Sequence, residues 1–474
     1  MIRFFPARHR RAALLLALCT SACASVPDLG PMPTGRTAPI AAASQTLAGT
    51  GSEWPGEGWW QRYPDPQLSK LIEEALANSP DLDVAAARIR VADGFAKQAG
   101  AALLPSATAG GTVGATRVGR PDGLPAEILP SGWNDSGAAG VGLTLDLDLW
   151  GKNRAALRAA KLDAQAARYD AAEARLALTT GIASIYAELA ALYAQHDSIA
   201  SAVAIRTQTL KLVDQRVGQG LDTQAALRQA RARLEQTQAN LTATDEAISL
   251  ARNAIAALVG TGPDRALTIA RPEIGALVPL DMPAGASANL VGRRPDIAAA
   301  RARLEASAQQ VKVARAGFYP DVSLSALAGF QSIGLSNLFT SNSFFGSAGP
   351  AVTLPLFRGG ALQGQYRARR GQYDEAVALY DRQVIEALRQ TADALTSRSL
   401  LASRLADSRR ALADFEEANR LARLRYSQGL STYLDVLSAE EGVLDSRLTV
   451  AKLETRSFAL DVTLIRALGG GFHS

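Results

Sequence analysis

The stretch Val141-Gly142-Leu143-Thr144-Leu145-Asp146-Leu147-Asp148-Leu149 alternates apolar residues with small, hydroxyl-bearing or acidic ones. A period of two places the two sets on opposite faces of a β-strand. From Lys152 the pattern changes, because 152–217 is 66 residues long and contains no proline and a single glycine. Such a run predicts a helix, which at 1.5 Å per residue would extend about 100 Å. The deciding unit is therefore a strand that leads into a very long helix.

The same unit occurs twice in the chain. Pro80-Asp81 recurs as Pro295-Asp296 at an offset of 215, and Gln219-Gly220-Leu221 recurs as Gln428-Gly429-Leu430 at an offset of 209. A small drift in offset is typical of a duplicated fold whose loops have changed in length. In the second copy the proline-free run is 361–427.

Each repeat also predicts a short and a medium helix. The proline-free runs are 24 residues long at 81–104 and 296–319, and 38 residues long at 222–259 and 431–468. A short and a medium helix together nearly match the long helix in length. We therefore expect them to stack end to end beside it.

The first long helix carries a coiled-coil seam. Twelve positions follow the 4,3 spacing of a heptad repeat, and ten of them are apolar: Leu178, Ile182, Ile185, Leu189, Leu192, His196, Ile199, Val203, Arg206, Leu210, Val213 and Val217. We interpret His196 and Arg206 as solvated or partnered polar residues that fix the register. Hydrophobic residues are 47% of the chain but aromatic ones only 6%, so Ala and Leu dominate, which favours closely packed helices.

Four strands are predicted, at about 105–116, 138–149, 320–332 and 350–357, with loops at 117–137 and 333–347. Residues 322–357 contain no charged side chain, yet scattered Gly, Pro, Ser and Asn argue against a membrane helix. Strands of about ten residues with one apolar face are typical of a transmembrane β-barrel, and such barrels begin at about eight strands. Two copies would supply eight strands and three would supply twelve. A pair of soluble hairpins is the alternative.

The N-terminus predicts secretion and a lipid anchor. Four arginines precede Cys23 without an acidic residue, and an apolar run follows them, as in a signal peptide over 1–22. Thr20-Ser21-Ala22-Cys23 is similar to a bacterial lipobox, in which Cys23 would be lipidated, for example with palmitate. Cleavage after Ala24 is the alternative. Cys19 and Cys23 are the only cysteines, so an intrachain disulfide framework is excluded from the mature chain.

Six segments follow from these patterns. They are the signal peptide at 1–22, an N-terminal tether at 23–55 that we expect to be flexible to about Gly51, the first repeat at 56–260, an equatorial linker at 261–294, the second repeat at 295–469 and a C-terminal tail at 470–474.

Nucleic-acid binding and catalysis are not indicated. The formal charge of +5 falls to +1 after Cys23, with 46 basic and 45 acidic residues. The three histidines, His9, His196 and His473, are far apart, and Gly151-Lys152 lacks the remaining residues of a phosphate-binding loop. We expect no enzyme activity, no catalytic residue, no cofactor and no metal site.

Several motifs in order resemble the outer-membrane efflux protein family, in its lipoprotein branch of the NodT/OprM type. They span about 55–471 and include Trp59-Trp60-Gln61-Arg62-Tyr63, Leu147-Asp148-Leu149-Trp150-Gly151, Arg293-Arg294-Pro295-Asp296-Ile297 and Leu354-Pro355-Leu356-Phe357-Arg358. The resemblance implies a mainly α fold with a membrane β-barrel: a duplicated unit of long coiled-coil helices plus two strands, assembled as a homotrimer with a 12-stranded β-barrel on an α-helical tunnel. It also implies a location in the bacterial outer membrane, lipid-anchored and spanning, with a periplasmic helical body.

The resemblance also implies functional residues. The two helix-hairpin tips would meet the periplasmic adaptor through Gly220, Leu221, Thr223, Gly429, Leu430 and Thr432, with Asp222 and Ser431 suited to N-capping. Tyr426 and Asp435 match positions that constrict the periplasmic mouth. Ser431 and Ser438 depart from the best-known relative, which has Arg and Asp at these places, so the gate network is thinner here.

The expected function is a passive exit duct for drugs or other small molecules. The expected partners are outer-membrane lipid, a periplasmic adaptor and an inner-membrane resistance-nodulation-division pump. Type I protein secretion is the alternative within the family. A soluble coiled-coil scaffold is the alternative outside it.

Overall fold

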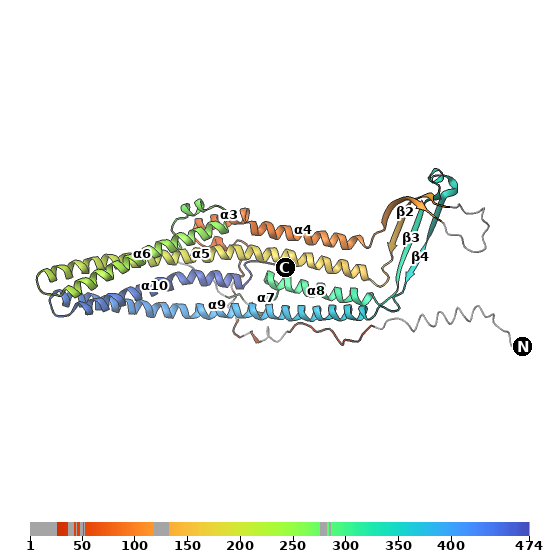
Figure 1. The fold of residues 1–474 in the computed structure, drawn as a ribbon. Helices are drawn as coiled ribbons and strands as arrows, with labels where there is room; N and C mark the ends of the chain where they lie inside the picture. Colours follow the sequence, from red (N-terminus) through yellow and green to blue (C-terminus); the bar gives the residue numbers. More distant parts are fainter. Residues whose placement is uncertain are drawn as a thin grey trace. The chain divides into compact units, whose positions relative to one another are not determined.

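The computed structural model describes residues 26–36, 42–43, 45–47, 51, 53–117, 132–274, 282–283 and 286–473. The chain divides into two compact units. Figure 1 shows the helices and strands of the described residues. The strand unit comprises the described parts of Met1–Gly35, Arg88–Ala167 and Ala300–Tyr380, and the hairpin unit those of Arg36–Ala87, Arg168–Ala299 and Asp381–Ser474. Each unit therefore combines segments of both sequence repeats.

The predicted helices form in matched pairs. The long helices are α5 (Lys152–Gly218) and α9 (Ala361–Ser427), each of 67 residues. The medium helices are α6 (Gln224–Leu258) and α10 (Tyr433–Ala467), each of 35 residues, and the short helices are α4 (Pro80–Ala101) and α8 (Pro295–Ala316), each of 22 residues. These equal lengths agree with the duplication inferred from the sequence. Further elements are α3 (Pro66–Asn78), α7 (Ala286–Arg293) and the short 3-10 helices η1 (Trp59–Arg62), η2 (Pro263–Thr268), η3 (Leu335–Asn337) and η4 (Ser341–Ser343).

Two glycines show how the helix ends meet in the hairpin unit. Gly260, after α6, has φ +78°, and a Cβ there would lie 2.5 Å from the backbone oxygen of Asn78, next to the start of α4. Gly469, after α10, has φ +91°, and its Cβ would lie 1.9 Å from the backbone oxygen of Arg293, next to α8. Only glycine tolerates both the conformation and the approach. The end of each medium helix therefore abuts the start of a short helix, as predicted.

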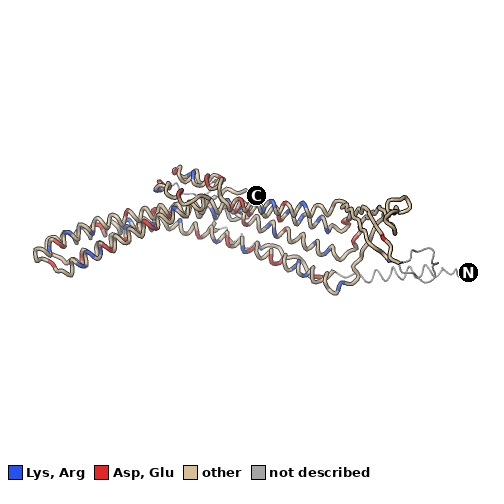
Figure 2. Tube along the Cα trace, turned by 45° about the horizontal axis from the view of Figure 1, so that its top comes forward, with Lys and Arg blue, Asp and Glu red and all other residues tan. Residues whose placement is uncertain are grey.

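The strand unit contains one antiparallel sheet in the order β1-β2-β3-β4. The strands are β1 (Ser106–Thr116), β2 (Asn134–Asp146), β3 (Asp321–Ile333) and β4 (Phe344–Thr353). The central pairing of β2 with β3 joins the two repeats, with Thr144 opposite Ser325. Figure 2 shows the charged residues interspersed along the helices, whereas the strands are mostly uncharged.

The predicted bounds of two strands were wrong. The strand predicted at 138–149 is β2, which ends at Asp146, because Asp148 adopts φ +46° and the chain turns there. The strand predicted at 350–357 is β4, which begins at Phe344 because Phe344 to Ser347 pair with Phe330 to Leu327. Alternation alone missed this pairing, since aromatic and small residues follow one another there.

The segment 26–36 was predicted to be part of a flexible tether, and this was wrong for its described residues. Val26 and Leu29 pack against a core cluster of α8 and α9. The Tyr373 hydroxyl donates to the carbonyl of Pro33 at 2.7 Å, and the Arg370 guanidinium donates to the carbonyls of Gly30 and Pro31. The prolines and glycines make the segment poor in secondary structure, but they leave its carbonyls free for these bonds.

The seam predicted on α5 is largely buried in the hairpin unit. Leu178, Ile182 and Leu189 belong to its main core cluster with residues of α3, α6 and α10. Arg206 is buried and donates to the carbonyl of Arg233 and to Thr237, while His196 lies near Asp197 and Asp245. Both interruptions are thus partnered. Among the described helices, α5 has an 18-residue window apolar enough to span a membrane, and half of that window is buried within the protein.

Candidate functional site at the hairpin tips

Each helix hairpin of the hairpin unit closes through a glycine turn. After α5, Gly220 has φ +70°, and its N–H donates to the carbonyl of Val217 at 3.0 Å while Leu221 N–H donates to Arg216 at 2.8 Å. After α9, Gly429 has φ +75° and the same bonds run to Tyr426 and Arg425. This left-handed glycine cap satisfies the last carbonyls of a helix. Leu221 and Leu430 are left 60% and 69% exposed, so each tip presents one leucine.

The predicted caps of the next helices were one residue too early. The N-caps are Thr223, whose hydroxyl accepts from Ala226 N–H at 3.2 Å, and Thr432. Asp222 and Ser431 instead belong to the turns, because the glycine turn requires one more residue before the helix begins. Thr223 and Thr432 thus have a local structural role in addition to their place at the tips.

Tyr426 connects the two hairpins. Tyr426 is 1% exposed, and its hydroxyl donates to Asp222 Oδ2 at 2.5 Å, across 204 residues of sequence. The Arg216 guanidinium lies 4.6 Å from the ring centroid, and its Nε is 3.9 Å from Asp222 Oδ2. Burial, with the hydrogen bond to Asp222, raises the pKa of Tyr426, so it stays a neutral donor. Sequence reasoning selected Tyr426 but missed Asp222 as its partner, since only the fold brings the two turns together.

Asp435 lies on the surface of α10, and no hydrogen bond joins it to Tyr426 in the described part of the chain. Its Oδ2 accepts from the backbone N–H of Thr432 at 2.9 Å and from the Thr432 hydroxyl at 3.0 Å. These hydrogen bonds lower the pKa of Asp435. The carboxylate is therefore ionised at neutral pH and stabilises the first turn of α10.

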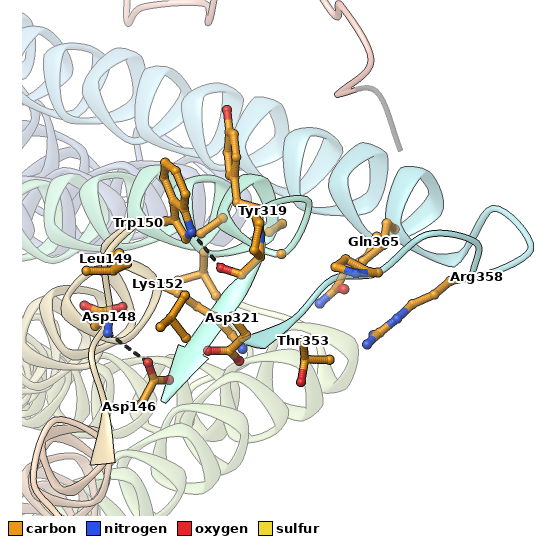
Figure 3. A pocket seen from close by; sticks show the side chains of 18 residues that line it. Asp146, Asp148, Leu149, Trp150, Lys152, Tyr319, Asp321, Thr353, Arg358 and Gln365 are labelled. Carbon is orange, nitrogen blue, oxygen red and sulfur yellow. Dashed lines mark hydrogen bonds between the residues drawn. The ribbon is translucent and has the colours of Figure 1, made fainter. Parts of the chain in front are cut away.

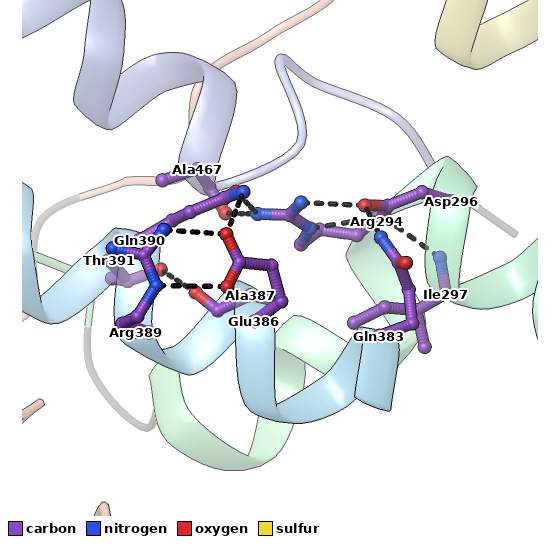
Figure 4. Close-up of polar contacts among 10 residues, drawn as sticks. All are labelled: Arg294, Asp296, Ile297, Gln383, Glu386, Ala387, Arg389, Gln390, Thr391 and Ala467. Carbon is purple, nitrogen blue, oxygen red and sulfur yellow. Dashed lines mark hydrogen bonds and ion pairs between the residues drawn. The ribbon is translucent and has the colours of Figure 1, made fainter. Parts of the chain in front are cut away.

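The Arg294-Pro295-Asp296 motif builds a buried network in the hairpin unit (Figure 4). Arg294 donates to both carboxylate oxygens of Asp296, at 3.0 and 2.6 Å, to Gln390 Oε1 at 3.1 Å and to the carbonyl of Ala467 at 3.0 Å. Burial opposes ionisation of Asp296, but Arg294 and Gln383 outweigh it and lower its pKa. The motif therefore joins the start of α8 to α9 and to the end of α10, and it is structural.

The Leu147-to-Gly151 motif shapes a cavity of about 250 Å³ at the strand ends of the strand unit (Figure 3). Trp150 stacks on Tyr319 with centroids 4.8 Å apart, and its indole Nε1 donates to the carbonyl of Pro320 at 2.7 Å. Asp146 and Asp148 lie at one end of the cavity, and Arg358 and Gln365 lie at the other (Figure 3). No group of three or more metal-ligating side chains occurs in the part of the chain that the structure describes.

The comparison with known families matches residues 71–261 and 287–470 to the family described as Outer membrane efflux protein. The chain belongs to this family. It is 34% identical to the fusaric acid resistance protein FusA of Burkholderia cepacia over 75% of this chain and 68% of FusA. It is 31% identical to the multidrug resistance outer membrane protein MdtP of Escherichia coli, over 89% of this chain and 88% of MdtP.

Among solved structures, the chain resembles the outer membrane protein VceC of Vibrio cholerae with a TM-score of 0.83. The two share 44% identity, over 89% of this chain and 100% of VceC. As a member of the family, the chain is an outer-membrane efflux protein, located in the outer membrane with a helical periplasmic body. Its fold is that of a mainly α-helical channel subunit, and the family is one of transport ducts.

Proposed function

We propose that this chain is the passive exit duct of a tripartite system that expels small molecules. Three copies would close a 12-stranded barrel, a periplasmic adaptor would meet the hairpin tips, and an inner-membrane resistance-nodulation-division pump would supply the energy. The names of FusA and MdtP, which refer to fusaric acid and multidrug resistance, support small-molecule cargo. No enzyme activity is part of this proposal.

The open edges of the sheet are the main observation that supports this proposal. Its four strands leave β1 and β4 as open edges, and no further strand is present in the described residues to cover them. Open strand edges are not tolerated in lipid, because each unpaired backbone group costs several kcal/mol there. In a ring of identical chains, the β1 edge of each copy can pair with the β4 edge of its neighbour. A ring of three copies thus supplies the missing partners and the twelve strands.

Lipidation of Cys23 completes the anchoring. Cys23 lies outside the described residues, but the segment from Val26 is bound along the helices of the strand unit. A lipid on Cys23 would add membrane affinity of about 0.8 kcal/mol per buried CH₂ group. The barrel and the lipid would then both hold the strand unit at the membrane.

The proposal is tested by the native mass of the detergent-extracted particle and the mass of its N-terminal peptide, for wild type and Cys23→Ala. We expect three copies per particle, and a diacylated Cys23 peptide in wild type that Cys23→Ala lacks. A monomer that is extracted without detergent would contradict the channel, and an unmodified peptide starting at Ser25 would contradict lipidation alone.

The hairpin tips are proposed to bind the adaptor through Leu221 and Leu430. Changing either leucine to aspartate places a charge on an apolar contact, so we expect loss of drug resistance in cells with normal amounts of trimer. Leu267, which is 81% exposed but lies on η2, supplies the matched control as Leu267→Asp. Wild-type drug resistance in both tip variants, as in Leu267→Asp, would exclude the tips as the adaptor contact.

A further inference from the structure

A buried carboxyl group in the hairpin unit has only half of its hydrogen bonds. Glu440 on α10 is 5% exposed. Its Oε1 accepts from the Thr209 hydroxyl of α5 at 2.5 Å, whereas its Oε2 is buried and has no hydrogen-bond partner. A buried polar atom without a partner is costly, so this oxygen requires an explanation.

A second unpartnered oxygen lies in the same place. Asn419 on α9 is 8% exposed, and its Oδ1 is buried without a partner. Glu440 and Asn419 line one small cavity of about 10 Å³ together with Arg206 of α5 and Arg447 of α10. That volume holds about one water molecule. Two residues with an unpartnered buried oxygen therefore line the same small cavity.

Both arginines that line the cavity form hydrogen bonds with other residues. Arg206 donates to the carbonyl of Arg233 and to Thr237, and Arg447 donates to Glu416 Oε1 at 2.9 Å. In the described part of the chain Glu440 forms no ion pair within 4.0 Å. The other charged or titratable groups around Glu440 are Arg423 of α9, the ion pair of Arg233 on α6 with Glu441 on α10, and Tyr433 of α10.

We propose that Glu440 is a proton-binding site that locks α10 against α5 and α9 beneath the hairpin tips. A proton on Oε2 converts this atom from an acceptor into a donor. It then supplies the missing hydrogen bond to Asn419 Oδ1, either directly or through one water in the cavity. Loss of the proton leaves both oxygens without a donor and adds a buried negative charge, which loosens the packing of α10.

The direction of the pH dependence follows from burial. Burial raises the pKa of Glu440 above its ordinary value of 4.5, although the bond from Thr209 and the charges of Arg423 and Arg206 oppose this. A carboxyl whose folded-state pKa is raised contributes full stability below its unfolded-state pKa and loses it as the pH rises through the folded-state value. The lock is therefore tight in acid and weakens towards alkaline pH.

Hydrogen exchange on the full-length protein in detergent tests this site. We compare wild type with Glu440→Gln, whose amide can accept from Thr209 and donate to Asn419 as the protonated acid does. In wild type we expect protection of 198–209 and 436–447, corrected for intrinsic rates, to fall at least tenfold from pH 4.5 to pH 8. In Glu440→Gln we expect protection to stay at the acid level throughout. A pH profile in Glu440→Gln equal to that of wild type would overturn the proposal.

Two further variants keep the test decisive. Glu441→Gln removes the neighbouring exposed carboxylate and should retain the wild-type profile. Asn419→Asp places a second carboxyl in the cavity, so one of the two must keep a proton to higher pH, and the fall in protection should move to higher pH. An unchanged midpoint in Asn419→Asp would count against a shared proton even if Glu440→Gln fails to fold.

The consequence for transport rests on the proposed function and is measured separately, as conductance in planar bilayers. Wild-type conductance should rise with pH, and that of Glu440→Gln should stay low and independent of pH. Absence of any conductance, combined with the expected exchange profiles, would overturn the exit duct and leave the proton site standing. A pH-dependent conductance in Glu440→Gln would show that protonation of Glu440 does not control the opening of the channel.

Discussion

At the residue scale, Asp148 explains why an aspartate stands in the middle of the Leu147-to-Gly151 motif. It is the one non-glycine residue at positive φ in the described part of the chain, and aspartate tolerates that conformation better than most residues. Its carboxylate accepts from the backbone N–H of Asn153 at 2.8 Å and of Arg154 at 2.9 Å, and from Arg154 Nε at 3.0 Å. One side chain thus ends β2 and caps the start of α5.

Replacing Asp148 by alanine should destabilise the protein by about 1–2 kcal/mol, the usual cost of losing a helix cap. Burial opposes its ionisation, but the hydrogen bonds from Arg154 and Asn153 prevail and lower the pKa of Asp148. Its stabilisation is therefore present above pH 3.8 and is lost as the pH falls through the folded-state pKa. Unfolding in denaturant at pH 7 and pH 3 measures this. Asp148→Asn, which keeps an acceptor and tolerates positive φ, should lose less, and an equal loss in both variants would argue against the cap.

The Tyr426 hydroxyl is the second residue-scale case. Tyr426→Phe keeps the ring in its core cluster but removes the bond to Asp222, so we expect a loss of about 1–3 kcal/mol. If the turns form the gate, conductance should also rise. Tyr433→Phe is the matched control, because Tyr433 belongs to the same cluster and its hydroxyl has no hydrogen bond in the described structure. Equal effects of the two variants on stability and conductance would show that the hydrogen bond is unimportant.

At the element scale, Arg370 and Tyr373 of α9 hold the N-terminal segment 26–36, and we call this pair the clamp. The composition of the segment does not predict this contact. Residues 26–36 contain prolines and glycine, which predict irregular backbone, and this is what forms. Irregular backbone is still ordered when its carbonyls find donors. Arg370 and Tyr373, one turn apart on α9, supply those donors. Val26 and Leu29 of the segment add apolar contacts with α8 and α9.

Removing the clamp should free the segment without unfolding α9. In Arg370→Ala combined with Tyr373→Phe, we expect trypsin cleavage after Arg36 to accelerate at least tenfold, measured by mass spectrometry of the native protein. Tyr366→Phe is the control, since Tyr366 packs in the same cluster through its ring and its hydroxyl has no hydrogen bond among the described residues. If cleavage is as slow in the double variant as in the control, the clamp does not hold the segment.

Much of the helical fold could be predicted from the sequence, and less of the site. Long proline-free runs set the extents of α5 and α9 almost to the residue, because nothing inside them can end a helix. The first and last residues of β2 and β4 depend instead on cross-strand partners that lie far away in sequence. For the same reason Tyr426 could be selected from a motif, whereas Asp222, Glu440 and Asn419 could not, since their roles arise only where the hairpins pack together.

At the scale of the whole molecule, the sheet is the part that one chain cannot complete. In an antiparallel pair, successive residues of a strand direct their N–H groups alternately towards the two neighbouring strands. Every second N–H of β1 therefore points away from β2. In a monomer those groups would be free, and in a closed barrel each of them is bonded to another copy. The two cases respond differently to proline, which removes the N–H group.

Thr112→Pro and Val113→Pro, made singly, use this difference. Thr112 and Val113 are neighbours opposite Ala138 and Gly137 of β2, so one variant removes an N–H directed at β2 and the other an N–H directed at the open edge. An open edge tolerates proline at the outward position. A closed trimer tolerates it at neither, because each lost bond leaves a carbonyl unpaired in hydrocarbon, at several kcal/mol, three times per particle. We therefore expect both variants to reduce the trimer at least tenfold on native mass measurement. A full yield of trimer from the variant that lacks the outward N–H would show that β1 is not paired between copies.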